Sequence, residues 1–140
     1  VGRSTFYSHY ESKELLLDEL CRYLFLHLFE REENISIEAY LTHIFLHFKK
    51  NQDHVTSLLF SKNDYFLRQL QKELEHHVYP MVAEDLQVSY PNIPSSFLKH
   101  FVVTNFIETL TWWLKKGKSY KEDQVVRFYL DVIEMTNKQK

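Results

Sequence analysis

Apolar and polar positions alternate with the repeat of an α-helix along almost the whole chain. Within most segments the apolar residues are separated by three or four positions, as on one face of a helix. The segment 13–32 is apolar on nearly all sides, so we expect neighbouring helices to cover it from several directions. The pattern predicts helices over residues 13–32, 37–51, 53–60, 64–86, 95–116 and 120–136.

Several residues mark where these helices begin and end. Ser36 can cap the second helix, because its hydroxyl can accept from an amide of the first turn. Pro80 must end or kink the long fourth helix, since proline lacks the amide hydrogen and clashes with the preceding turn. Gly117 is expected to close the fifth helix in a left-handed conformation. Ser119 with Glu122 predicts a capping box before the last helix.

The composition supports an all-α fold. Two glycines and three prolines leave little material for tight turns, which favours long helices over hairpins. Aromatic residues make up 16% of the chain, so rings must build much of the core or of a pocket. The single cysteine, Cys21, excludes an intrachain disulfide and fits a reducing cytoplasm. No apolar run is long enough to span a membrane.

The first residues carry a motif that fits a DNA-reading helix. A helix in the major groove needs polar side chains toward the bases, donors for the phosphates and apolar residues on its back. Thr5, Tyr7 and His9 can supply the first two, and Phe6 and Tyr10 can supply the last. The net charge of the whole chain is −2, so contact with DNA depends on a local patch of this kind.

This stretch resembles the end of the DNA-binding domain of the TetR family of bacterial transcriptional regulators. The family pattern here is a small hydroxyl residue, an aromatic residue or leucine, tyrosine, any residue, histidine and an aromatic residue. Two variable positions, a lysine and an acidic and apolar run follow. The resemblance covers about residues 1–20, and the residues that fit are Thr5, Phe6, Tyr7, His9, Tyr10, Lys13, Glu14 and Leu16.

The resemblance implies an all-α, TetR-like repressor with the remnant of a helix-turn-helix domain at 1–13. A helical effector-binding and dimerisation domain would follow at 14–140. The DNA-contacting residues that it implies are Arg3, Ser4, Thr5, Tyr7, His9 and Lys13. The first four would lie near bases of operator DNA, and Tyr7, His9 and Lys13 would contact phosphates. It also implies two further helices before the first residue, so we expect this chain alone to bind operator DNA weakly or not at all.

The helix over 95–116 carries small and aromatic residues, which are typical of a helix that pairs across a two-fold axis. The TetR resemblance implies that the last two long helices form a four-helix bundle in a homodimer. The string 110–117 also resembles the Trp-Leu-x-x-Gly end of the penultimate helix in one branch of the family. The predicted interface, within 95–137, comprises Phe97, Phe101, Asn105, Glu108, Trp112, Phe128 and Tyr129. The alternative is that these residues form only the core of a monomer.

The central helices could enclose a site for a small-molecule effector. Aromatic walls with a few polar groups are what such a site needs. The candidate lining residues are Tyr40, His43, Phe45, His47, Phe60, Tyr65, Phe66, His77 and Phe106. A closely packed aromatic core gives the same pattern, and the sequence leaves both interpretations open.

No cofactor, metal or catalytic activity is predicted. His43 and His47 lie four positions apart and could reach one metal ion, but a site needs further ligands and the only cysteine lies on another helix. The chain contains no phosphate-binding glycine loop, nucleophile elbow or His-Glu-x-x-His motif. The alternative to a regulator is a helical protein-interaction module without DNA binding. A regulator differs in being a two-fold dimer through 95–137 that displays residues 1–13 outward.

Overall fold

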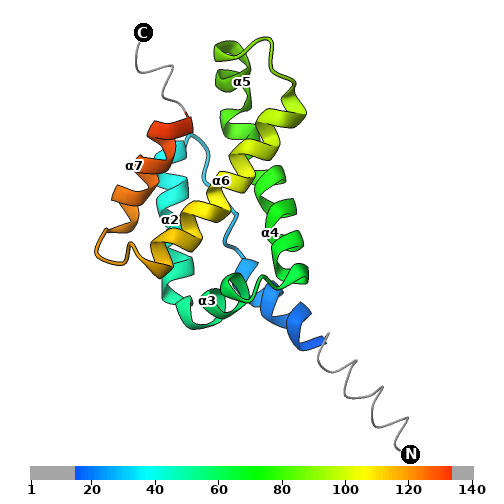
Figure 1. Cartoon of the computed structure of the whole chain (residues 1–140), viewed down its shortest axis with the longest axis vertical. Coiled ribbons are helices and arrows are strands. Elements are labelled where there is room, and N and C mark those ends of the chain that lie inside the picture. The colour runs from blue at the N-terminus through cyan, green and yellow to red at the C-terminus, as the bar shows by residue number, and fades with distance from the viewer. Residues whose placement is uncertain (1–14, 134–140) are drawn as a thin grey trace, which may run out of the picture.

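The computed structural model describes residues 15–133, and this part of the chain is helical without strands (Figure 1). Residues 15–25 form the first described helix. The helices that follow are α2 (Ile37–Lys50), α3 (Gln52–Phe60), α4 (Asp64–His77), α5 (Tyr79–Ser89), α6 (Ser95–Lys115) and α7 (Glu122–Ile133). The all-α fold predicted from the sequence is confirmed.

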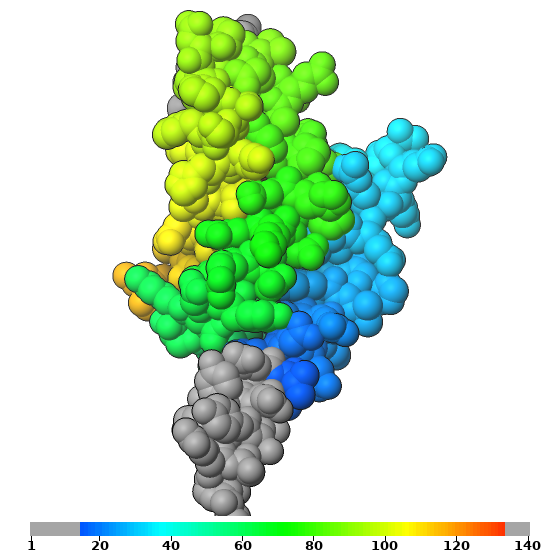
Figure 2. Space-filling model, turned by 90° about the vertical axis from the view of Figure 1, so that its right-hand side faces the viewer, coloured from blue at the N-terminus to red at the C-terminus, as the bar shows by residue number. Residues whose placement is uncertain are grey.

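The α6 helix runs diagonally through the middle of the molecule and contacts α3, α4, α5 and α7 (Figure 1). The α2 and α7 helices pack against each other on one side of it, while α4 and α5 lie on the other. Figure 2 shows α4 and α5, in green, running along one face of the molecule beside α6, in yellow. The central position of α6 puts one side of this helix in the core and leaves the other side free.

Aromatic rings build the centre of the core, as the composition predicted. The Phe106 ring of α6 packs edge-on against Phe45 of α2 at 5.0 Å between centroids, and against Tyr129 of α7 at 5.8 Å. Phe45 also contacts Trp113, at 5.5 Å. Phe45, Phe106 and Trp113 are at most 1% exposed. These contacts join α2, α6 and α7 into one unit.

Two predicted helix ends are confirmed. The Ser36 hydroxyl accepts from the Ala39 amide at 3.1 Å, which caps α2. The predicted 64–86 helix is divided at Val78 into α4 and α5, and Pro80 lies in the first turn of α5. Proline is tolerated there because the amides of a first helical turn have no partner within the helix.

The first helix ends at residue 25, not at residue 32 as predicted. His27 adopts a left-handed backbone conformation, with φ of 60°, and the chain turns away. The turn brings Leu28 and Phe29 into the core, where the Phe29 carbonyl accepts from the Tyr40 hydroxyl at 2.7 Å. Leu28 and Phe29 thus reach the core from a non-helical turn. The spacing of apolar residues alone does not distinguish this arrangement from a longer helix.

The connection between α6 and α7 also differs from its prediction. Gly117 has no positive φ, so it is not a left-handed cap. Its amide donates to the carbonyls of Trp112 and Trp113, each at 3.1 Å. The start of α7 is held by the Lys121 amide, which donates to the Gln124 side chain at 2.9 Å, and not by the predicted Ser119 and Glu122 pair. A glutamine three residues after the cap supplies the same return bond that a capping-box glutamate would.

Candidate functional site

One face of α6 carries a row of exposed residues, although large rings are usually buried. Phe97 is 55% exposed, Phe101 38% and Trp112 42%. Asn105 and Glu108 lie between Phe101 and Trp112 in the same row. Successive members are four, four, three and four positions apart, so they lie on one side of the helix. We call Phe97, Phe101, Asn105, Glu108 and Trp112 the α6 stripe.

Residues after α6 extend this apolar face. Tyr120 of the connecting turn is 40% exposed, and Phe128 and Val132 of α7 are 43% and 57% exposed. A single exposed apolar residue is ordinary, whereas a row of them marks a surface that contacts another molecule. Tyr120 and Val132 were not among the predicted interface residues. The four-residue spacing of Phe128 and Val132 could have identified Val132, whereas Tyr120 lies in a turn without periodicity.

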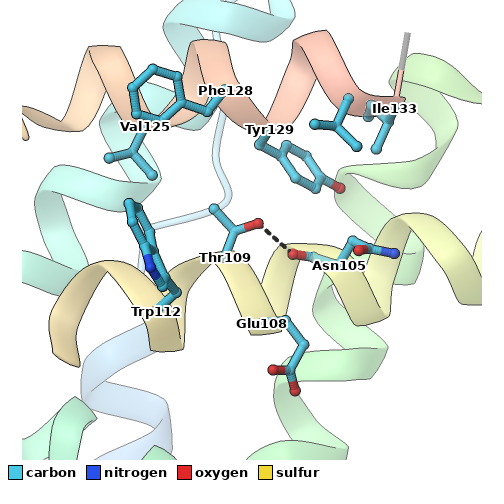
Figure 3. Close-up of a pocket in the computed structure, with 9 residues that line it drawn as sticks. Asn105, Glu108, Thr109, Trp112, Val125, Phe128, Tyr129 and Ile133 are labelled. Atoms are coloured by element: carbon cyan, nitrogen blue, oxygen red, sulfur yellow. Dashed lines mark hydrogen bonds between the residues drawn. The ribbon is translucent and has the colours of Figure 1, made fainter. Parts of the chain in front are cut away.

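A groove of about 340 Å³ lies between α6 and α7 (Figure 3). The residues that line it are Asn105, Glu108, Thr109, Trp112, Val125, Phe128, Tyr129, Val132 and Ile133. Figure 3 shows the Trp112 ring pointing from α6 toward Val125 of α7, while Glu108 points away from α7. Because its walls are mostly aromatic and aliphatic, the groove can receive apolar side chains.

An aromatic cluster shapes one end of this face. The Trp112 ring stacks on Tyr120 at 5.9 Å between centroids, and Tyr120 meets Phe128 edge-on at 5.2 Å. The turn itself is fixed by the Trp113 indole, which donates to the Tyr120 carbonyl at 2.9 Å. Gly117 leaves space for the Trp112 ring in this position, since a Cβ here would lie 2.7 Å from Cζ3 of Trp112. The glycine thus positions a ring of the α6 stripe.

Tyr129, a predicted interface residue, is buried within the subunit. It is 3% exposed, and its hydroxyl donates to the Val102 carbonyl at 2.6 Å. It ties α7 to α6 and forms part of the groove wall. The predicted interface residues therefore divide into an exposed set on the α6 stripe with Phe128, and Tyr129 beneath them.

Four of the residues predicted to line an effector pocket lie in the packed core. Tyr40, Phe45, Phe66 and Phe106 are at most 1% exposed. None of them lines the groove between α6 and α7. Their positions match the packed aromatic core that the sequence left open as the alternative.

Two further predicted pocket residues lie at the surface. His43 is exposed on α2. Phe60 of α3 is 41% exposed, and the Lys115 ammonium lies 5.6 Å from the centre of its ring. Among the described residues, these six predicted pocket residues are thus divided between the core and the surface.

Tyr65 and His47 attach the first described helix to the body. The Tyr65 hydroxyl of α4 donates to the Asp18 carboxylate at 2.7 Å, and this bond raises the pKa of Tyr65. Nε2 of His47, on α2, lies 2.8 Å from the Leu24 carbonyl and donates to it when the ring carries a hydrogen on this nitrogen. Residues 15–25 are therefore connected to both α4 and α2. Asp18 was not predicted, because nothing in the sequence distinguishes it from its neighbour Glu19.

His77, the last of the predicted pocket residues, ends α4 and packs against the turn after the first helix. Its ring stacks on Phe29 at 5.2 Å and 10°, and its Nε2 lies 3.2 Å from a carboxylate oxygen of Glu73. Burial lowers the pKa of His77, and His76 and Arg31 act in the same direction, while Glu73 opposes them. The contact joins a titratable ring to the segment that leads out of the first helix.

Some predicted sites cannot be placed. The DNA-contacting residues Arg3, Ser4, Thr5, Tyr7, His9 and Lys13 lie outside the described residues. Within residues 15–133, no three histidine, cysteine, aspartate or glutamate side chains are grouped closely enough to hold a metal ion. In the same range no helix is both long and apolar enough to cross a membrane.

Comparisons with known proteins agree with this architecture. A family model described as the C-terminal region of transcriptional regulators matches residues 35–135. One similar solved structure is the crystal structure of a TetR transcriptional regulator from Streptococcus agalactiae 2603V. It is 48% identical, with a TM-score of 0.74, and the match covers 96% of this chain and 76% of that one. No curated protein matches the chain.

Proposed function

The chain belongs to the TetR family of transcriptional regulators, and we propose that it acts as a homodimeric, DNA-binding repressor. The observation that carries this proposal is the exposed apolar face of α6 and α7. A monomer would leave the rings of Phe97, Phe101, Trp112 and Phe128 partly in water. Removing a large apolar side chain from water contributes about 1.5–3 kcal/mol when burial is complete, so several such rings favour association.

A second copy is the partner that fits this face best. Most soluble oligomers are two-fold dimers in which the same surface of both subunits meets. With α6 and α7 from each subunit, such a dimer forms a four-helix bundle. The groove between these helices offers space for apolar side chains of the other copy.

Residues 1–13 supply the DNA contacts in this proposal. The predicted contacts are Arg3, Ser4, Thr5, Tyr7, His9 and Lys13. In a two-fold dimer the two reading helices enter successive major grooves, about 34 Å apart. A small-molecule effector would change the affinity for DNA only if it bound the protein more tightly in one position of the first helix than in another. The bonds from Tyr65 to Asp18 and from His47 to Leu24 connect the first helix to α4 and α2.

Replacing Trp112 tests the dimer. Trp112→Asp puts a charge into the proposed contact, so we expect a monomer where the parent chain of 17.0 kDa sediments as a dimer. Phe60→Asp is the matched control, because Phe60 is 41% exposed, close to the 42% of Trp112, but lies on α3. Helix content by circular dichroism shows that both variants fold. A folded Trp112→Asp dimer would contradict the assignment.

DNA binding is tested by selecting duplexes from a random pool with the intact protein. We expect enrichment of a sequence with two-fold symmetry, and weaker binding after Lys13→Ala. Loss of one phosphate contact lowers the slope of log affinity against log salt by about one. Lys62→Ala, on the surface between α3 and α4, is the control. Failure to enrich any sequence would refute the repressor proposal.

A further inference from the structure

Four residues of the α6 stripe form a pattern that reads alike in both directions. Phe101, Asn105, Glu108 and Trp112 are, in order, aromatic, polar, polar and aromatic. They are separated by four, three and four positions, so the pattern is symmetric about a point between residues 106 and 107. At about 100° per residue they fall within an arc of about 60° on one side of the helix.

This symmetry is what an antiparallel pair of identical helices requires. If the two-fold axis passes between residues 106 and 107, Phe101 faces the partner's Trp112 and Asn105 faces the partner's Glu108. The axis repeats each contact, so all four residues are matched in both subunits. Each aromatic ring then faces an aromatic ring of the partner, and each amide faces a carboxylate.

Asn105 and Glu108 each need a hydrogen-bond partner if the interface covers them. Glu108 is the only acidic residue of α6, and it has no hydrogen bond or ion pair to any other described residue. A carboxylate covered by an interface without a partner is strongly unfavourable. Asn105 uses one amide hydrogen in a bond of 2.8 Å to the Phe101 carbonyl, and its second amide hydrogen can be donated to a carboxylate.

The register shifted by four residues matches these residues less well. Moving one helix by four residues, so that Phe97 faces the partner's Trp112, sets Phe101 against the partner's Glu108. That register places the charge against a ring and leaves the carboxylate without a donor. The groove beside Trp112 gives space to the ring that faces Trp112 in either register, so the match of Asn105 with Glu108 decides between them.

We therefore propose that the two α6 helices of the dimer pair antiparallel about an axis between residues 106 and 107. Asn105 donates to the partner's Glu108, and Phe101 packs against the partner's Trp112. This register rests on the homodimer proposed above and specifies how the two copies meet. It makes the pair of Asn105 and Glu108 the element that selects the register.

A charge exchange tests the polar contact. Asn105→Asp sets two like charges against each other at two symmetric places, and we expect the dimer dissociation constant to rise roughly tenfold or more. Adding Glu108→Lys restores an opposite-charge pair and should return the constant to within about threefold of the parent value. The control is Glu75→Lys, an exposed carboxylate of α4, which should leave the constant unchanged. An Asn105→Asp dimer of parental affinity, or no recovery in the double variant, would overturn the register.

Disulfide trapping tests the aromatic contact. In a Cys21→Ala background, the double variant Phe101→Cys with Trp112→Cys should form a covalent dimer on mild oxidation. Eleven residues of helix separate these positions by about 16 Å, so a bond within one chain is impossible. Each single variant should remain uncrosslinked, because its own copy lies equally far away in this register. Crosslinking of a single variant, or none in a double variant that still sediments as a dimer, would refute the register while the dimer stands.

Discussion

At the scale of single residues, Gly117 controls the position of a ring that the proposed dimer uses. A Cβ there would overlap Trp112, with Cζ3 2.7 Å and Cη2 2.9 Å away. Trp112 is 42% exposed and can swing outward, so Gly117→Ala should lower the free energy of unfolding of the monomer by no more than about 1.5 kcal/mol. The displaced ring would leave its stack on Tyr120. We expect weaker self-association, measured by sedimentation equilibrium.

The control for Gly117→Ala is Lys116→Ala, at the neighbouring exposed position. It should leave the dissociation constant of the dimer unchanged. Parental self-association in Gly117→Ala would mean that the Trp112 position is irrelevant to the contact between subunits.

His77 predicts how stability depends on pH. Its pKa in the folded chain is lowered from the ordinary value of 6.5, chiefly by burial. Between the two pKa values the unfolded chain binds more protons, so this residue destabilises the fold progressively as pH falls below about 6.5. Its contribution stops changing below the folded pKa. His77→Phe keeps a ring on Phe29 and removes the titration, so urea unfolding at pH 7.5 and 5.5 should show a smaller loss of stability than in the parent.

The matched control for His77 is His43→Gln, since His43 is exposed on α2. It should retain the parental difference in unfolding free energy between the two pH values. An unchanged difference in His77→Phe would show that other groups cause the pH dependence.

At the scale of elements, helix identity could be predicted from the sequence, but some helix ends could not. The breaks at Ser36 and Pro80 are confirmed because their cause lies within a few residues. The local rules for Gly117 and for Ser119 with Glu122 were wrong, because the chain after α6 is held by other bonds. The turn after the first helix is held by Tyr40, eleven residues beyond its acceptor Phe29. A contact at that separation leaves no trace in local periodicity, and the helix was therefore predicted too long.

Tyr40→Phe measures what that distant contact contributes. The change removes a buried hydroxyl and leaves the Phe29 carbonyl without its partner. Such a loss costs about 1–3 kcal/mol, so we expect the urea midpoint to fall without a change in the m-value. Tyr23→Phe is the control, because Tyr23 is 62% exposed and should lose almost nothing. Equal effects of the two substitutions would contradict a structural role for the Tyr40 hydroxyl.

At the scale of the whole molecule, the shared face of the α6 stripe could be predicted better than the packing of the central rings. The α6 stripe is a property of one helix, so its spacing is visible in the sequence. A pocket depends on whether rings from several helices fill the space between them. In this chain Phe45 and Phe106 meet at 5.0 Å and are fully buried, which the sequence could not decide. Most of the family motif lies before position 15, outside the described structure.

A dimer links stability to protein concentration. If folding is completed by association, unfolding separates two subunits, and the apparent melting temperature rises with concentration by mass action. A tenfold increase adds about 1.4 kcal/mol per dimer, which corresponds to a rise of roughly 2 °C for two chains of this length. Trp112→Asp should melt at a temperature independent of concentration, because its unfolding involves one chain. Scanning calorimetry over a hundredfold concentration range distinguishes the two, and a concentration-independent parent chain would show that the apolar face of α6 and α7 does not hold two copies together.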